Sequence, residues 1–282
     1  MASRAGITII KANGERVPFD IQKLEAAVRR SGATARLAKA TARRVAGRVR
    51  EGMTTQAIAA IAQQFLHREQ PRAAIRYSLK EAMRRLGPTG YDFEKFIAEV
   101  LRAYGYAAEL PDLLPGMCVQ HEVDVVARKD GRTAMVECKY RNEPGIYVRL
   151  KDVMATWARF EDLREARVAG KCPITFDEGW IVCNTKVTSD GVAFGGCKGM
   201  RLIGWRHPED RGLERMIEER HLYPITVLTS VRPPDFVRFA AAGIMLCHDL
   251  TAIDVDQLVR HTGLPRQRIE RMRGEVSGVL RC

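Results

Sequence analysis

Residues 120–140 have the sequence QHEVDVVARKDGRTAMVECKY, and this stretch decides the fold. Two runs rich in β-forming residues, Val119–Ala127 and Thr133–Tyr140, lie on either side of Asp130-Gly131. An Asp-Gly dipeptide between two such runs is typical of a tight hairpin turn. The pattern therefore predicts two antiparallel strands, with the second ending at Tyr140.

Helical and strand patterns alternate on both sides of this hairpin. Upstream, apolar residues recur at helical spacing from Phe93 to Tyr104. Downstream, a long helix is predicted over 148–169. The remaining predicted elements are strands at 180–184 and 201–205, helices near 192, 213–222 and 234–242, and a helical tail over 253–280 that breaks at 262–265. Strands enclosed by helices indicate an α/β domain.

The predicted hairpin places three side chains that could perform chemistry close together. Residues i and i+2 of a strand share a face, so Glu137 and Lys139 should point one way and Cys138 the other. The antiparallel partner brings Asp124 near Glu137. Two carboxylates without a basic partner on their strands repel each other, which a divalent cation between them would relieve. Carboxylate ligands with retained waters are typical of Mg²⁺, with Mn²⁺ as the alternative.

Such a cation would stabilise charge on a scissile phosphate and lower the pKa of its water, while Lys139 would orient that water or stabilise the leaving oxygen. Glu122 shares a strand face with Asp124 and is a further candidate metal ligand. The alternative is a solvated strand face with a Glu137–Lys139 ion pair, but the apolar neighbours of these residues favour the site. For His121 we favour a structural role over that of a general base or DNA contact.

Asp124, followed thirteen residues later by Glu137-Cys138-Lys139, resembles the D…ExK core of restriction-endonuclease-like nucleases of the PD-(D/E)xK type, Mrr-like branch. The helix that begins at Tyr91-Asp92-Phe93-Glu94 is similar to the Phe-Glu helix that opens that domain. The resemblance covers about 90–190. It implies a mixed-sheet α/β domain, magnesium-dependent endonuclease activity on DNA, and a Glu94 that completes the metal site. The Mrr-like branch usually has glycines near its aspartate, and this chain does not.

The N-terminal region has a different pattern. Asn13-Gly14 separates two short β-rich runs within 7–19, and Asp20 is typical of a helix N-cap. Three further helices are predicted at 35–50, 55–70 and 72–86, before a Gly87-Pro88-Thr89-Gly90 linker. We therefore divide the chain into units 1–88, 89–250 and 251–282, the last a helical C-terminal extension.

Residues 5–88 resemble the ATP-cone, the allosteric domain of ribonucleotide reductases and of the repressor that controls their genes. The resemblance rests on Ile9–Asp20, Lys23-Leu24, Met53–Ile58 and Arg76–Ser78. It implies that ATP or dATP binds as an allosteric ligand, with contacts from Lys11, Lys23, Thr55 and Arg84. Ala12 stands where the family commonly has a second basic residue. A cone kept only for dimerisation or basic DNA contacts is the alternative.

Charge is distributed unevenly. Residues 1–90 hold 18 Lys or Arg and 6 Asp or Glu, so 18 − 6 gives the whole net charge of +12. The rest holds 28 of each sign. The excess favours a polyanionic partner of the first unit over a merely soluble basic surface.

Seven cysteines without a CxxC pair argue against a disulfide framework and a zinc knuckle, and are typical of a reducing cytoplasm. No apolar run approaches the roughly 20 residues of a membrane span, so we expect no membrane partner.

Two weaker motifs leave alternatives open. Asn184-Thr185-Lys186 follows an apolar strand, so it is either a phosphate contact or a locally bonded turn. The tail carries Arg266, Arg268, Arg271 and Arg273, which form either a DNA-binding element or, as we prefer, part of a packed helical hairpin.

Together these features predict a cytoplasmic, metal-dependent DNA endonuclease that ATP or dATP regulates, and that forms a homo-oligomer. The rival is a nucleotide-responsive DNA-binding regulator with an inactive nuclease fold.

Overall fold

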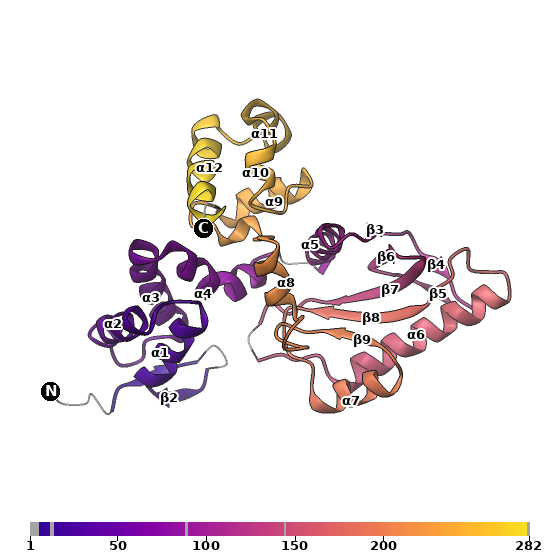
Figure 1. The fold of residues 1–282 in the computed structure, drawn as a ribbon, viewed down its shortest axis with the longest axis horizontal. Helices are drawn as coiled ribbons and strands as arrows, with labels where there is room; N and C mark the ends of the chain where they lie inside the picture. The colour runs from indigo at the N-terminus through magenta and orange to yellow at the C-terminus, as the bar shows by residue number, and fades with distance from the viewer. Residues whose placement is uncertain (1–5, 12–13, 88–89, 144, 281–282) are drawn as a thin grey trace.

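The computed structural model describes residues 6–11, 14–87, 90–143 and 145–280, and Figure 1 shows their arrangement. A helical N-terminal unit lies on one side of the molecule and a sheet covered by helices on the other. A second helical unit, formed by the C-terminal residues, stands between and above them.

The N-terminal unit is a small hairpin with four helices. Strands β1 (Thr8–Ile10) and β2 (Arg16–Pro18) pair antiparallel, and Asp20 caps the first helix by accepting from Gln22 N at 2.9 Å. Its helices are α1 (Ile21–Arg30), α2 (Ala35–Ala46), α3 (Thr55–Glu69) and α4 (Pro71–Arg84). Their apolar faces form one core around Val28, Ala42 and Leu66. The predicted order of elements is confirmed. The turn residues Ala12 and Asn13 lie outside the described residues.

A five-stranded sheet forms the centre of the second unit. Its order is β3-β6-β7-β8-β9, with β3, β6 and β7 antiparallel and β7, β8 and β9 parallel. The strands are β3 (Ala107–Glu109), β6 (Val125–Lys129), β7 (Arg132–Lys139), β8 (Glu178–Cys183) and β9 (Arg201–Ile203). This is the mixed α/β architecture that the sequence predicts. Asp130 and Gly131 both have positive φ, as a tight turn between β6 and β7 requires.

Helices cover both faces of this sheet. Helix α5 (Gly90–Ala103) packs on one face, whereas α6 (Leu150–Val168) and α7 (Ser189–Cys197) pack on the other, as Figure 1 shows. Phe93 and Phe96 of α5 are fully buried against the sheet. The predicted apolar stripe of this helix is thus its core face.

One strand prediction is wrong. The run Val119–Ala127 is not a single strand, because β5 (Gln120–His121) pairs with β4 (Leu114–Pro115) in a separate small sheet. The chain then leaves that sheet and joins β7 only from Val125 onward. Asp124 therefore lies in a bend directly before β6 rather than on a strand.

The C-terminal region is helical, as predicted. It comprises α8 (Leu213–Glu219), the 3₁₀ turn η1 (Ile225–Val227), α9 (Pro233–Ala241), α10 (Asp249–Ala252), α11 (Val255–Thr262) and α12 (Arg266–Leu280). Gly263 takes a φ of 65° and separates the last two helices. These helices share one continuous core with α5 and the sheet.

Helix α4 belongs to two cores. Ala73 and Ala74, in its first turn, pack inside the N-terminal unit, whereas Leu79 and Met83, with Leu86 just after the helix, pack in the core of the sheet and the C-terminal helices. Thr226 of η1 donates to Ala82 O at 2.8 Å. The N-terminal unit is therefore not attached by its linker alone.

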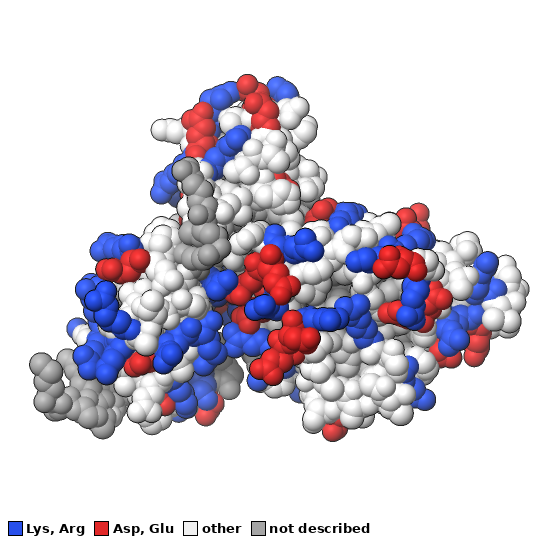
Figure 2. Space-filling model, in the orientation of Figure 1, with Lys and Arg blue, Asp and Glu red and all other residues white. Residues whose placement is uncertain are grey.

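Figure 2 shows that Lys and Arg predominate over the N-terminal unit, whereas both signs of charge mix over the sheet unit. Among the described residues, no helix combines the length and apolar character that crossing a membrane requires.

Candidate functional site

Asp124 is fixed at the end of the sheet by a main-chain hydrogen bond. Its Oδ2 accepts from Cys138 N at 2.6 Å, just beyond the last paired residues of β6 and β7, Val125 and Val136. The Asp124 carboxylate thus accepts a hydrogen bond from β7 at the point where the main-chain pairing of β6 with β7 ends. The proximity of Asp124 to Glu137, expected from a continuous strand, arises from this bend.

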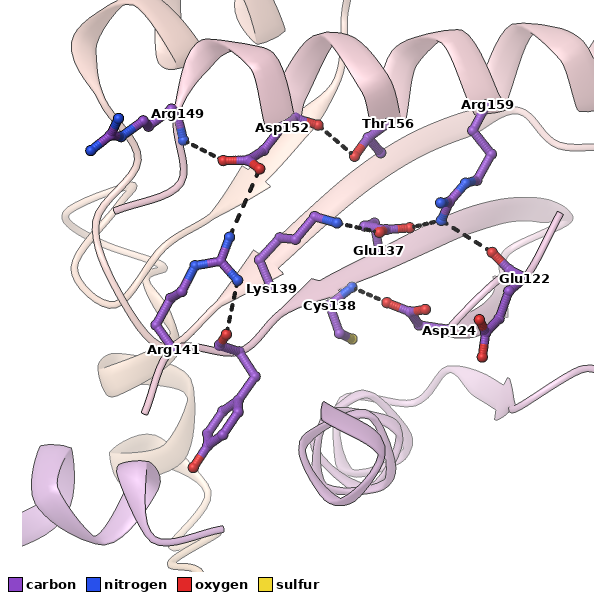
Figure 3. Close-up of polar contacts among 11 residues, drawn as sticks. Glu122, Asp124, Glu137, Cys138, Lys139, Arg141, Arg149, Asp152, Thr156 and Arg159 are labelled. Atoms are coloured by element: carbon purple, nitrogen blue, oxygen red, sulfur yellow. Dashed lines mark hydrogen bonds and ion pairs between the residues drawn. The ribbon is translucent and has the colours of Figure 1, made fainter. Parts of the chain in front are cut away.

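Glu137 and Lys139 point toward α6, and Cys138 points to the opposite side, as Figure 3 shows and as the strand alternation predicts. Glu137 is buried, and its carboxylate forms ion pairs with Lys139 and with Arg159 of α6. Arg159 also donates to the main-chain oxygen of Glu122 at 3.1 Å. The Glu137–Lys139 pair of the alternative interpretation exists, but it lies in a buried site rather than on a solvated face.

Arg159 is the functional residue that the sequence interpretation missed. Arg159 lies seven residues, about two helical turns, after Asp152. Both side chains therefore project from the face of α6 that covers the sheet, as Figure 3 shows. A basic residue on the inner face of this helix was the available signal. Its guanidinium holds Glu137 from the side opposite the hairpin.

Burial and neighbouring carboxylates raise the pKa of Asp124 and of Glu94. Burial raises the pKa of Asp124 to about 6, and Glu137 adds to this, while Cys138 N–H, Lys139 and Arg159 act in the lowering direction.

Glu94 of α5 faces the same group of carboxylates. Burial raises the pKa of Glu94 to about 7. Its acidic neighbours raise it further, in the order Asp124, Glu122, Glu137 and Asp92. Negative charge is therefore concentrated between Glu94 and Asp124.

Within the described residues, no group of three or more His, Cys, Asp or Glu side chains is arranged to hold a metal ion. Mg²⁺ is commonly held by only one or two carboxylates, with waters and substrate phosphate as its other ligands. Asp124 and Glu137, with Glu94 beside them, supply such a donor set, and their mutual repulsion is what a cation would relieve. The residues present therefore fit a divalent cation of this kind.

Glu122 and His121 have different surroundings. Glu122 is exposed, and its side chain turns away from Glu137 toward the α5 side, so the shared strand face that was predicted for it does not exist. His121 Nε2 lies 2.7 Å from Asp162 Oδ2 of α6, and Asp162 also accepts from Cys118 N at 2.9 Å. These bonds attach the β4–β5 hairpin to α6, which supports the structural role for His121.

The residues expected to contact nucleotide fall into two places. Lys11 directly follows β1, and Thr55 opens α3, which meets β1 through the Ile10–Thr54 bridge. Lys23, highly exposed, lies in the first turn of α1. Arg84 lies at the other end of the unit, where it pairs with Glu81 at the junction with the sheet unit.

The two weaker motifs are mostly bonded within the chain. Asn184 accepts from Arg141 N and donates to Arg141 O, both at 2.9 Å, and Thr185 donates to Ile146 O, which leaves only Lys186 exposed.

The tail arginines behave similarly. Arg266 pairs with Asp256, and Arg268 pairs with the buried Asp235 at 2.6 Å. Arg273 donates to Ile253 O at 3.0 Å. Arg266 and Arg273 therefore bond within the tail and Arg268 bonds to α9, which favours the packing interpretation.

Comparisons with known proteins identify the two ends of the chain. Residues 7–86 match the ATP cone domain, and residues 223–280 match the family described as AF1548-like, C-terminal. An uncharacterized protein of Archaeoglobus fulgidus is 33% identical over 184 residues, which are 65% of this chain and 99% of that protein.

A solved structure is also similar. The crystal structure of the protein of unknown function AF1548 has a TM-score of 0.59 and 32% identity, and the match covers 68% of this chain and 98% of that chain. The chain therefore belongs to the same family as the Archaeoglobus fulgidus protein, with an ATP cone domain at its N-terminus and an AF1548-like domain at its C-terminus.

Proposed function

We propose that the sheet unit is a divalent-metal-dependent endonuclease of the PD-(D/E)xK type that hydrolyses DNA, under the control of ATP or dATP bound to the cone. The observation that carries this proposal is the set of mutually repelling carboxylates at one end of β6 and β7. Asp124 and Glu137 lie there, with Lys139 directly beside Glu137, and both carboxylates act electrostatically on Glu94 of α5.

In the proposed reaction a water oxygen bonds to phosphorus, a P–O ester bond breaks, and a proton passes from the water to the leaving oxygen. Bound Mg²⁺ or Mn²⁺ would stabilise charge on the phosphate and acidify the water. Asp124 and Glu137 would hold the ion, and Glu94 would face it from α5. Lys139 is placed to hold the attacking water or to donate to the leaving oxygen. Arg159 keeps Glu137 oriented.

Control by the cone has a physical route through α4. Tyr140 directly follows Lys139, and its hydroxyl donates to Arg84 O, in the last turn of α4, and to Gly87 O at 3.2 Å. The strand that carries Glu137 and Lys139 is thus bonded to the end of the cone's last helix. A nucleotide that changes the position of α4 would change the position of this strand.

Oligomerisation is the second part of the proposed control. The ATP cone acts in the families that it characterises by changing subunit association, and a duplex-cutting nuclease of this type often needs two active sites. We expect ATP or dATP to shift this chain between a dimer and a larger form, with cleavage changing in parallel.

A specific observation also favours the rival function, a nucleotide-responsive DNA-binding regulator. Both carboxylate oxygens of Glu137 are already paired with cations, Lys139 and Arg159. Two such ion pairs would stabilise the buried Glu137 carboxylate in a protein whose site no longer binds a metal ion. The two functions differ in whether the phosphodiester bond breaks.

Incubation of the full chain with labelled duplex DNA, single-stranded DNA and RNA separates them. Each substrate is tested with Mg²⁺, Mn²⁺ or a chelator, and with or without ATP. The nuclease predicts metal-dependent DNA fragments at a rate that ATP alters. The regulator predicts intact DNA under all conditions and an ATP-dependent change in DNA affinity.

A further inference from the structure

Four basic side chains gather where α4 meets the C-terminal ends of the parallel strands. Lys186 follows β8 and Arg206 follows β9, and Trp205 N donates to Thr185 O at 2.7 Å, which holds these two segments together. Helix α4 contributes Lys80 and, one turn later, Arg84. Arg84, Arg206 and Lys186 all act on Lys80 electrostatically. We call Lys80, Arg84, Lys186 and Arg206 the junction cluster.

The charges of the junction cluster are only partly compensated. Arg84 pairs with Glu81, and Arg206 pairs with Glu214. Lys80 and Lys186, by contrast, form no side-chain hydrogen bond or ion pair with any described residue. The Lys80 ammonium is half-buried and lies 5.9 Å from the centre of the Trp205 ring. Burial lowers the pKa of Lys80, and the neighbouring cations lower it further, while Glu214 acts in the opposite direction. The cluster is therefore short of negative charge.

The Trp205 side chain, beside Lys80, also has a polar group without a partner. Its indole N–H is buried and has no acceptor among the described residues. Buried donors are nearly always satisfied in folded proteins.

The junction cluster lies at the same end of the sheet as the carboxylate site. Lys139 pairs with Cys183 in the register of β7 and β8, and the basic groups that act on the Cys183 thiol are Arg141 and Lys80. Ligands of open α/β sheets bind beyond the carboxyl ends of the strands. Cations that follow two adjacent parallel strands therefore stand where a ligand of this sheet is expected.

We propose that the junction cluster binds phosphates of the nucleic-acid backbone that also occupies the carboxylate site, so that α4 of the ATP cone forms part of the substrate-binding surface. This inference rests on the nucleic-acid substrate of the proposed function, and it adds which residues outside the carboxylate site bind the backbone. A polyanion fits because several cations with few counterions lie along adjacent chain segments. The phosphates of free ATP are the other source of the same chemistry, but Lys11 and Thr55 lie at the opposite end of the cone.

The test measures binding without cleavage. A double variant, Lys80→Met with Lys186→Met, removes the two unpaired charges while keeping the apolar stems. A matched control, Arg36→Met with Lys39→Met, removes two exposed charges from α2. Affinity for a labelled duplex is measured by fluorescence anisotropy in chelator at several salt concentrations. Circular dichroism verifies the fold, and calorimetry measures ATP binding to each protein.

We expect the cluster variant to bind duplex at least about tenfold more weakly at 0.1 M salt, with its log–log salt slope reduced by about 1.8 for two lost phosphate contacts. The control and the ATP affinities should stay within about twofold of the wild-type values. An unchanged slope, an equal loss in the control, or a loss of ATP binding with DNA binding intact would each overturn the proposal.

Because the measurement needs no cleavage, the two proposals can fail separately. A folded wild-type protein that binds DNA and loses the expected slope in the cluster variant, yet never cuts, would support the junction cluster and reject the nuclease. A wild type that binds no DNA would reject the junction cluster.

Discussion

Replacing Asp124 with asparagine removes one charge from the carboxylate site and keeps the size of the side chain. The remaining amide oxygen can still accept from Cys138 N. The ordinary pKa of 3.8 rises to about 6 in the folded protein, mainly through burial and then through Glu137. That difference corresponds to about 3 kcal/mol, an upper figure because part of the repulsion relaxes.

The sign follows from which state binds the proton more tightly. The raised pKa means that the folded state keeps its proton between pH 3.8 and about 6, whereas the unfolded chain loses it. The stabilisation is present below pH 3.8, declines as the pH rises to about 6, and is absent above. The asparagine variant has no such decline.

Urea unfolding of both proteins, in chelator at pH 4.5 and pH 8, tests this directly. We expect the variant to gain about 1–3 kcal/mol relative to wild type on going from pH 4.5 to pH 8. Millimolar Mg²⁺ or Mn²⁺ should stabilise the wild type and leave the variant unchanged. A variant that is no more stable than wild type at pH 8 would refute the idea that Asp124 stands in uncompensated negative charge.

Three further predictions concern the rest of the chain. Tyr140→Phe removes the hydroxyl contacts to α4, so it should cost about 1 kcal/mol of unfolding free energy and bring the ratio of cleavage rates with and without ATP closer to one; an unchanged ratio would place the coupling elsewhere. Lys11→Ala should weaken ATP binding at least about tenfold in calorimetry, because it removes a charge from the phosphates; unchanged binding would contradict the assignment. Arg268→Met leaves the buried Asp235 without its ionic partner and should destabilise the fold by about 3 kcal/mol in urea unfolding, and a loss of DNA affinity at unchanged stability would restore the DNA-contact interpretation.

The sequence predicts most elements of this fold because their patterns are local. Helix α5 carries an apolar stripe at helical spacing, and the β6–β7 hairpin has both β-forming runs and an Asp-Gly turn. The break between β5 and β6 could not be predicted in this way. Val119–Ala127 is uniformly β-forming, and only the pairing of β5 with β4 ends the strand. Strands β3 and β4 are too short to leave a periodic signal.

For the candidate site, local patterns likewise predict some residues and miss others. Glu137 and Lys139 lie on one strand of the hairpin, and Asp124 directly precedes the other strand, so the sequence predicts that they lie close together, although it does not predict the bend that places Asp124. Arg159 comes from a helix, and its contact with Glu137 depends on how α6 crosses the sheet, which no local pattern specifies. The second role of α4 was hidden for a similar reason, because one apolar stripe serves two cores.

The central claim is that this chain cleaves DNA with the carboxylates at the end of β7. The most direct test is a cleavage assay with Mg²⁺ or Mn²⁺ on wild type, Glu137→Gln and Glu109→Gln. Glu109 is a matched control, because it lies on the same sheet and is also paired with an arginine, Arg128. The account predicts metal-dependent fragments from wild type and Glu109→Gln, and at least about a hundredfold slower cleavage by Glu137→Gln. Equal rates for all three proteins, or intact DNA in every reaction, would contradict it.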